Sequence, residues 1–293
     1  GGCVVFFLGY GDHWSLPRED RRQRRMCIRD RVWHFDVRGG AVASAVAEYL
    51  GLAGGLFWLR REIFGAAWRA LPAGALRQVA PMLQLLAVNR DIFIRSLALL
   101  TVFFFFTAQG AQAGDVTLAA NGVLMNFFML GSFVLDGFAT SAGQLTGRAL
   151  GARYRPAFVR AVRLCVGWGF AMAAVLSLAT VLGGGALIDL ITTAPAVRET
   201  ARVYLVWAML LPLAGVLAFE MDGVFIGATW TDDMRNMMLV SLAAYFAIWA
   251  VAVPALGNHG LWLALVSFLS LRGLTLLWRC PKRIAQAFPA EAG

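Results

Sequence analysis

Long apolar runs separated by short polar breaks dominate this chain from about residue 37 onward. An α-helix needs about 20 apolar residues to cross the hydrocarbon core of a bilayer. Seven runs come close to that length or exceed it: 37–59, 92–113, 118–145, 158–184, 203–229, 237–256 and 261–278. The pattern predicts an all-α fold, a polytopic membrane helix bundle with about seven transmembrane helices.

Composition supports a bilayer as the solvent of these helices. Of the 293 residues, 59% are hydrophobic and 15% are charged, and the mean hydropathy is +0.67. A soluble domain carries roughly a quarter charged residues. The formal net charge of +9 comes mainly from arginines outside the apolar runs. Such arginines are typical of cytoplasmic loops in membrane proteins and do not require a nucleic-acid partner. Membrane lipid is the expected surrounding.

The distribution of basic residues orients the bundle. The segment 61–90, the loop 148–163 and the C-terminal tail are basic, whereas the breaks 113–117 and 257–260 contain no Arg or Lys. Cytoplasmic loops are enriched in these two residue types. We therefore expect a multi-pass protein of the cell (inner) membrane with its C-terminus in the cytoplasm.

The same reading divides the chain into five parts. Residues 1–33 hold one short apolar run followed by a cluster of charges. We expect them to be non-native or disordered, and a basic cytosolic tail is the alternative. The other expected parts are the last helix of an N-terminal lobe at 34–60, a basic cytoplasmic connector at 61–90, a six-helix C-terminal lobe at 91–283 and a cytoplasmic tail at 284–293.

Acidic residues inside the runs are the first candidate functional groups. An acid at bilayer depth is costly and usually faces a cavity, a partner or an ion pathway. Asp136, Asp222 and Glu220 are therefore the candidates for coupling to an ion or a proton. The alternative for each is a structural pairing with an arginine or a helix end.

Two of these acids share a local pattern. "LDGF" at 135–138 is echoed by "MDGVF" at 221–225, late in two runs that point in the same direction. Asp136 and Asp222 are therefore expected at similar depth, nearer the cytoplasmic side. Glu220 lies two residues before Asp222, so the two acids are expected on different faces of one helix.

The face of the helix that carries Asp136 is small and polar. Thr140, Gly143, Gln144 and Gly147 follow it at helical spacing. Such a face admits another helix closely or borders water, whereas a lipid-facing stripe would consist of Leu, Ile and Phe.

Other polar residues at depth are candidates for pairing or for lining a cleft. Arg272 stands in the middle of the last run and needs an acid partner, with Asp136 and Asp222 as the first choices. Asn and Gln in membrane helices most often donate hydrogen bonds across helices. The complete set is Arg272, Asn121, Asn126, Thr140 and Gln144.

Motifs of enzymes and metal sites are absent from the sequence. It has no nucleotide-binding loop and no hydrolase or metalloprotease signature. The three histidines are isolated, and the four cysteines are scattered without metal-ligand spacing. We expect no enzyme activity, no metal and no bound cofactor.

Four stretches of the chain resemble the multidrug and toxic compound extrusion (MATE) family, closest to its DNA-damage-inducible protein F branch. They are "VRGGAVASAVAEYLGL" (37–52), "LAANGVLMNFFMLGSFVLDGFATSAGQLTGRALGAR" (118–153), "FEMDGVFIGATWTDDMRNMML" (219–239) and "GNHGLWLALVSFLSLRG" (257–273).

The resemblance implies a pair of six-helix lobes around a cleft that opens alternately to either side. It implies export of cationic or amphipathic compounds in exchange for H⁺ or Na⁺. The chain then corresponds to the sixth helix, the connector and the C-terminal lobe, with Asp136 on the eighth helix and Glu220 and Asp222 on the tenth. The alternative is a non-transporting membrane protein, such as a lipid-handling flippase or a scaffold.

Overall fold

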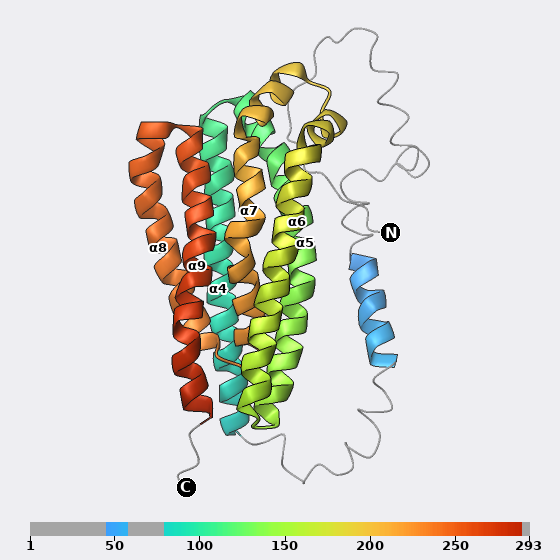
Figure 1. The fold of residues 1–293 in the computed structure, drawn as a ribbon, viewed down its shortest axis with the longest axis vertical. Helices are drawn as coiled ribbons and strands as arrows, with labels where there is room; N and C mark the ends of the chain where they lie inside the picture. The colour runs from blue at the N-terminus through green and yellow to red at the C-terminus, as the bar shows by residue number, and fades with distance from the viewer. Residues whose placement is uncertain (1–44, 58–78, 289–293) are drawn as a thin grey trace. The chain divides into compact units, whose positions relative to one another are not determined.

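Six long helices dominate the computed structural model, which describes residues 45–57 and 79–288 (Figure 1). All six are long and apolar enough to cross a membrane. They are α4 (Val79–Gln112), α5 (Asp115–Gly151), α6 (Arg155–Ile191), α7 (Pro195–Gly227), α8 (Thr231–Leu256) and α9 (Asn258–Ala287). A shorter apolar helix spans Ala45–Phe57. The predicted all-α membrane bundle is confirmed.

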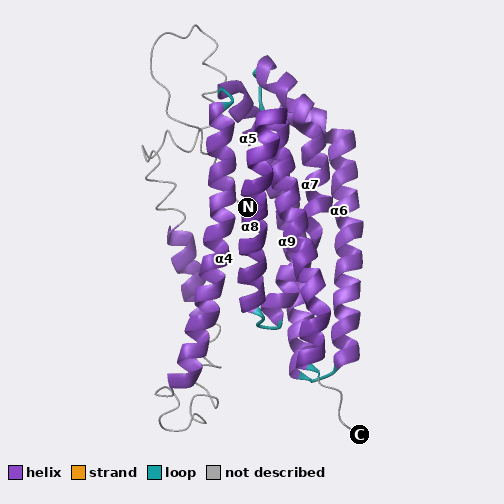
Figure 2. Cartoon of the chain, turned by 90° about the vertical axis from the view of Figure 1, so that its left-hand side faces the viewer, coloured by secondary structure: helices purple, strands orange, loops and turns teal. Residues whose placement is uncertain are grey.

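Turns of one to three residues join consecutive helices from α4 to α9, so neighbours in sequence run antiparallel. The α5–α6 pair and the α8–α9 pair stand on opposite sides of the bundle in Figure 1, with α4 and α7 between them. The perpendicular view shows the same upright arrangement (Figure 2). Of all six helices, α7 is the central one, because it packs against α5, α6 and α9. The helix Ala45–Phe57 belongs to a separate unit of the chain.

Two helices extend across predicted part boundaries. Residues 79–90, assigned to the connector, form about the first three turns of α4. Likewise, α9 continues to Ala287, into the predicted tail. Helical backbone hydrogen bonding can continue past the end of an uninterrupted apolar run, because adding a residue to an existing helix is far easier than starting one. The predicted segment 1–33, most of the predicted connector (61–78), the ends of the predicted helix 34–60 (34–44 and 58–60) and residues 289–293 of the tail lie outside the described residues.

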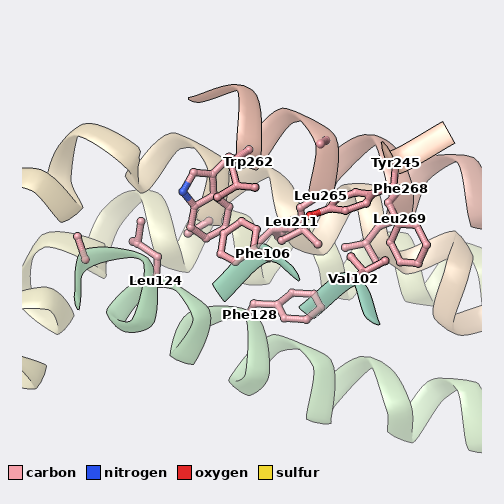
Figure 3. Packing of buried hydrophobic residues seen from close by; sticks show 14 of the residues in the cluster. Val102, Phe106, Leu124, Phe128, Leu211, Tyr245, Trp262, Leu265, Phe268 and Leu269 are labelled. Atoms are coloured by element: carbon pink, nitrogen blue, oxygen red, sulfur yellow. The ribbon is translucent and has the colours of Figure 1, made fainter. Parts of the chain in front are cut away.

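An aromatic-rich core joins α4, α5, α7, α8 and α9 (Figure 3). Phe106 of α4 meets Trp262 of α9 edge to face, with ring centroids 4.9 Å apart. Phe105 makes the same kind of contact with Trp249 of α8, also at 4.9 Å. Lipid is as apolar as these rings, so tight van der Waals packing and ring geometry supply the cohesion of this core.

The closest helix contact lies between α5 and α7. Gly143 and Gly147 of α5 face Gly223 and Gly227 of α7. A Cβ atom at Gly223 would lie 2.0 Å from the carbonyl oxygen of Ala139, and one at Gly227 would lie 2.1 Å from that of Gly143. Both pairs follow the small-xxx-small spacing that brings membrane helices into backbone contact.

Pro212 interrupts the hydrogen-bond ladder in the middle of α7. Proline has no N–H to donate to the carbonyl four residues earlier, and its ring crowds that turn. Ser177 of α6 donates a hydrogen bond from Oγ to the carbonyl oxygen of Met209, at 2.7 Å. A neighbouring helix therefore satisfies part of the backbone that the proline disturbs.

Charge is distributed unevenly between the two ends of the bundle. One end holds the α5–α6 and α7–α8 turns, the start of α4 and the end of α9, and we call it the basic end. Its cationic residues include Arg148, Arg153, Arg155, Arg160, Arg163, Arg235, Arg279, Lys282 and Arg283. At the opposite end, Arg198 and Arg202 both pair with Asp189, at 3.4 and 2.8 Å.

Candidate functional site

Asp222 is the meeting point of three helices. It lies on α7, five residues before the helix ends, and is buried. Arg95 of α4 and Arg272 of α9 both direct their Nη2 atoms at its Oδ2 atom. Arg272 therefore has the acid partner that its position in the sequence required. A single carboxylate serves two guanidinium groups in an apolar setting.

Some polar atoms of this cluster have no hydrogen-bond partner among the described residues. They are the Oδ1 atom of Asp222 and the Nε atoms of Arg95 and Arg272. Buried polar groups normally find partners. The three residues therefore retain one acceptor and two donors that another group or a water molecule could use.

Asp136 of α5 completes a four-residue charge cluster. It interacts electrostatically with both Arg272 and Arg95. Unlike Asp222, it is exposed on this lobe. With both acids ionised, the formal charges of two aspartates and two arginines cancel. Asp136 is the member of the cluster that an ion from outside the lobe can reach.

A polar stripe on α5 extends from Asp136 towards the basic end. Thr140 and Gln144 follow at intervals of one turn, and both are exposed. The Oγ1 atom of Thr140 donates a hydrogen bond to the carbonyl oxygen of Asp136, at 2.8 Å. Gly143 and Gly147, expected on the same face, instead pack on α7. The predicted face therefore divides into a helix contact and an exposed polar stripe.

Glu220 lies apart from the cluster, in the contact between α6 and α7. It is fully buried, and its two carboxyl oxygens have no hydrogen-bond partner within the described ranges. A Cβ atom at Gly169 of α6 would lie 2.6 Å from its Oε1 atom. Because Gly169 has no Cβ atom, the carboxyl group of Glu220 fits in the space beside it. Glu220 and Asp222 face different neighbours.

Comparison with known proteins places this geometry in a family. The family model described as MatE matches residues 92–251, more than half of the chain. The chain belongs to the MATE family. The predicted resemblance is confirmed.

Curated relatives of this MATE chain come from bacteria and plants. DNA damage-inducible protein F of Escherichia coli (strain K12) is 39% identical over 257 residues, which cover 84% of this chain and 54% of that protein. Protein DETOXIFICATION 44, chloroplastic, of Arabidopsis thaliana is 24% identical over 258 residues, covering 86% and 47%. The chain spans about half the length of the curated relatives it matches.

A solved structure shares the fold of the MATE chain. It is titled the inward-facing conformation of a multidrug resistance MATE family transporter of the MOP superfamily, and it aligns with a TM-score of 0.55. The identity is 20%, over 68% of this chain and 47% of that one. Together with the six spanning helices, the family and fold identify a multi-pass membrane protein.

The two asparagines predicted as pairing or cleft residues do not join the charge cluster of this MATE chain. Asn121 exchanges hydrogen bonds with Asn258 of α9, at 2.8 and 3.0 Å, and accepts one from Trp262. Asn126 donates to the carbonyl oxygen of Gly122 in its own helix, at 2.9 Å. Asn126 precedes Asp136 by ten residues, or about 15 Å along α5.

Arg95 is the one member of the cluster that the sequence reading missed. It stands in "DIFIRSLALL", within the first apolar run of the lobe. Arg95 is the fourth residue of the run 92–113 and was not among the predicted site residues. The rule that a charge at depth needs a partner holds for both signs, and it would have found Arg95.

Ion pairs at the basic end tie three helices together away from this cluster. Asp91 of α4 pairs with Arg235 of α8, at 2.5 Å. Asp233 of α8 pairs with Arg279 and Arg283 of α9, at 3.5 and 2.5 Å. These acids hold α8 against its neighbours and leave α5 and α6 without such pairs in the described part of the chain.

Proposed function

We propose that this MATE-family chain belongs to an efflux transporter that exports cationic or amphipathic compounds in exchange for H⁺ or Na⁺. The proposed membrane is the cell (inner) membrane, with the basic end and the C-terminus in the cytoplasm. The observation that carries the proposal is the cluster of Arg95, Arg272, Asp222 and Asp136, in which one acid is exposed. Asp136 and Asp222 are the proposed coupling residues.

The charge balance of the cluster suggests how exchange would work. With both acids ionised, the cluster is formally neutral and the carboxylate of Asp136 attracts a cation. A proton or Na⁺ on Asp136 leaves one net positive charge, which repels a cationic compound. The coupling ion and the compound would therefore exclude each other, as antiport requires.

The same neutralisation would alter how the helices hold together. Arg95 and Arg272 would then share Asp222 alone, and their mutual repulsion would weaken the junction of α4, α7 and α9. An ion shifts a conformational equilibrium only if it binds the two states differently. The junction supplies such a difference, since its stability depends on the charge of Asp136.

Glu220 ranks third among the coupling candidates. Its carboxyl group lies against Gly169 of α6, whereas the exposed stripe with Asp136 belongs to α5. We expect its replacement by Gln to reduce transport less than the replacement of Asp136 by Asn.

Dye efflux in vesicles tests the proposal. Because the chain spans about half of its relatives' length, the assay uses DNA damage-inducible protein F of Escherichia coli with this chain in place of its matching part. Vesicles with a pH gradient, a Na⁺ gradient or neither identify the coupling ion. The parent protein is assayed in parallel as a positive control.

Asp136→Asn should reduce efflux to the background of empty vesicles at unchanged protein yield. Asp115→Asn is the matched control, since Asp115 is an exposed acid at the other end of the same helix. Efflux that is insensitive to Asp136→Asn contradicts the coupling role. A chimera that inserts but transports no dye, beside an active parent, supports a scaffold or flippase instead.

A further inference from the structure

A shallow, open hollow of about 670 Å³, which we call the groove, borders the first turns of α6 at the basic end. Among the described residues, three arginines and three apolar side chains line it: Arg155, Pro156, Val159, Arg160, Arg163 and Leu164. The first turn of α6 contains no acid. The groove therefore combines concentrated positive charge with an apolar floor.

These three arginines have no ion-pair partner among the described residues. All three are exposed. Arg160 and Arg163 are also neighbours on one helix face, where like charges repel. The arginines of α8 and α9 hold their helices together, whereas these do not contribute to the fold through ion pairs. Their arrangement favours an anionic ligand.

The surface directly below the groove is apolar and continues along α6. Exposed side chains recur at helical spacing from Leu164 and Trp168 to Val175, Leu178 and Leu182. This stripe extends about 27 Å along the helix, close to the thickness of the hydrocarbon core. At Gly167, between Arg163 and Trp168, an added Cβ would meet nothing within 4 Å. Arginine charge and a lipid-facing surface are therefore continuous on one helix.

We propose that the groove binds the headgroup of an anionic phospholipid, whose acyl chains lie along the apolar stripe of α6. Guanidinium groups match phosphate oxygens through paired, charge-assisted hydrogen bonds. The first backbone N–H groups of α6 add partial positive charge at the same place. A soluble anion would contact the arginines but not the apolar side chains of the groove and the stripe, whereas a phospholipid would contact both. The site is independent of the proposed transport cycle.

Lipid retention tests the site on the purified chain. The chain is extracted from vesicles that contain equal amounts of phosphatidylglycerol and phosphatidylcholine, and native mass spectrometry counts the lipids that remain bound. The chain should retain phosphatidylglycerol in preference. The double variant Arg160→Gln with Arg163→Gln should lose this preference severalfold.

The matched control is Arg148→Gln with Arg153→Gln. These two arginines are exposed at the same end, have no ion pair within the described residues and do not line the groove. The control variant should keep the preference of the parent chain. If both variants lost the preference for phosphatidylglycerol equally, general electrostatic attraction at the basic end would explain it, and the proposed site would be overturned. Equal retention of both lipids by the parent chain would overturn it as well.

Trp168 locates the bound lipid. The fluorescence of Trp168 is the difference between the signals of the parent chain and of the variant Trp168→Phe. Brominated phosphatidylglycerol should quench this fluorescence more strongly than brominated phosphatidylcholine does. The groove variant should remove that difference. Equal quenching by the two lipids in the parent chain contradicts the proposed position. Displacement of phosphatidylglycerol by excess inorganic phosphate would assign the groove to free phosphate and overturn the lipid site.

Discussion

Asp222 balances two arginines from helices that are far apart in the sequence. The carboxylate is buried, and so is the guanidinium group of Arg272. Removing one partner of a buried ion pair leaves an uncompensated charge and costs about 3–5 kcal/mol. At the residue scale, Asp222 is therefore a structural junction as well as a proposed coupling group.

We predict that Asp222→Asn lowers the folded yield of the chain strongly. Arg95 and Arg272 would then repel each other with only the exposed Asp136 nearby. Adding Arg272→Gln should restore part of the yield, since it removes the second buried charge. Fluorescence-detected size-exclusion chromatography measures the folded fraction. The control is Asp232→Asn, which removes a more exposed pair with Arg283 and should change the folded fraction little. A normal yield for Asp222→Asn would contradict the structural role of Asp222.

Glu220 should behave in the opposite way. A buried carboxylate without a partner would be costly, so the neutral acid is the form that suits this position. Glu220→Gln keeps the shape and stays neutral, and we expect a thermal unfolding temperature close to that of the parent chain. The infrared carbonyl band of a protonated carboxylic acid should disappear in the variant. An unchanged infrared spectrum would show that Glu220 is ionised.

The sequence located most of the charge cluster but could not assemble it. The free-energy cost of a charge at bilayer depth identifies Asp136, Asp222 and Arg272 as candidates, each from its own helix alone. Their partners come from other helices, and Arg95 lies 127 positions before Asp222. Which side chains meet depends on helix rotation and crossing, and the hydropathy of a single helix does not encode these.

At the scale of elements, α5 and α7 approach until their backbones touch. Gly223 and Gly227 leave no space for a side chain. Overpacking a well-packed contact typically costs about 1–3 kcal/mol. This contact fixes the depth of Asp136 relative to Asp222 and therefore the geometry of the charge cluster.

We predict that Gly223→Ala and Gly227→Ala each destabilise the chain by about 1–3 kcal/mol, because each added methyl group would clash with the backbone of α5. Gly122→Ala and Gly137→Ala are matched controls on α5, where an added Cβ meets nothing within 4 Å. The controls should be neutral or slightly stabilising, since Ala favours helix. Unfolding in a denaturing detergent series measures the difference. Equal stability of all four variants would argue against the close contact.

The elements themselves were largely predictable. Each of the six apolar runs of the lobe lies mainly within one helix. In lipid, a run of about 20 apolar residues must satisfy its backbone hydrogen bonds internally, and a helix does so. The start of α4 at Val79 was not predicted, because Pro81, Gln84, Asn89 and Arg90 interrupt the apolar residues before position 92. Small residues at Gly143 and Gly147 signalled a helix contact but did not identify α7 as the partner.

For the whole molecule, the uneven distribution of arginines predicts the orientation in the membrane. Within the described ranges, the arginines without an ion-pair partner belong to the basic end, and Arg198 and Arg202 at the other end are neutralised in part by Asp189. Positive loops remain in the cytoplasm. Both the basic end and the C-terminus should therefore be cytoplasmic.

Cysteine labelling in intact cells measures this orientation. In a chain with its native cysteines replaced by Ser, Ala113→Cys in the α4–α5 turn should react with a membrane-impermeant maleimide from outside. Ala152→Cys in the α5–α6 turn should react only after the cells are opened. Both turn positions are exposed. The reverse pattern would invert the proposed topology.

Pro212 makes the middle of α7 easier to bend than the rest of the helix. The segment beyond it, towards the basic end, carries Glu220, Asp222 and both glycines that contact α5. The proline removes one backbone hydrogen bond of this turn, so a tilt there meets less resistance than elsewhere in the helix. Because Gly143 and Gly147 of α5 pack against the distal segment, this part of α5 would move with it. A small rotation at Pro212 would then become a larger displacement of the Asp136 stripe.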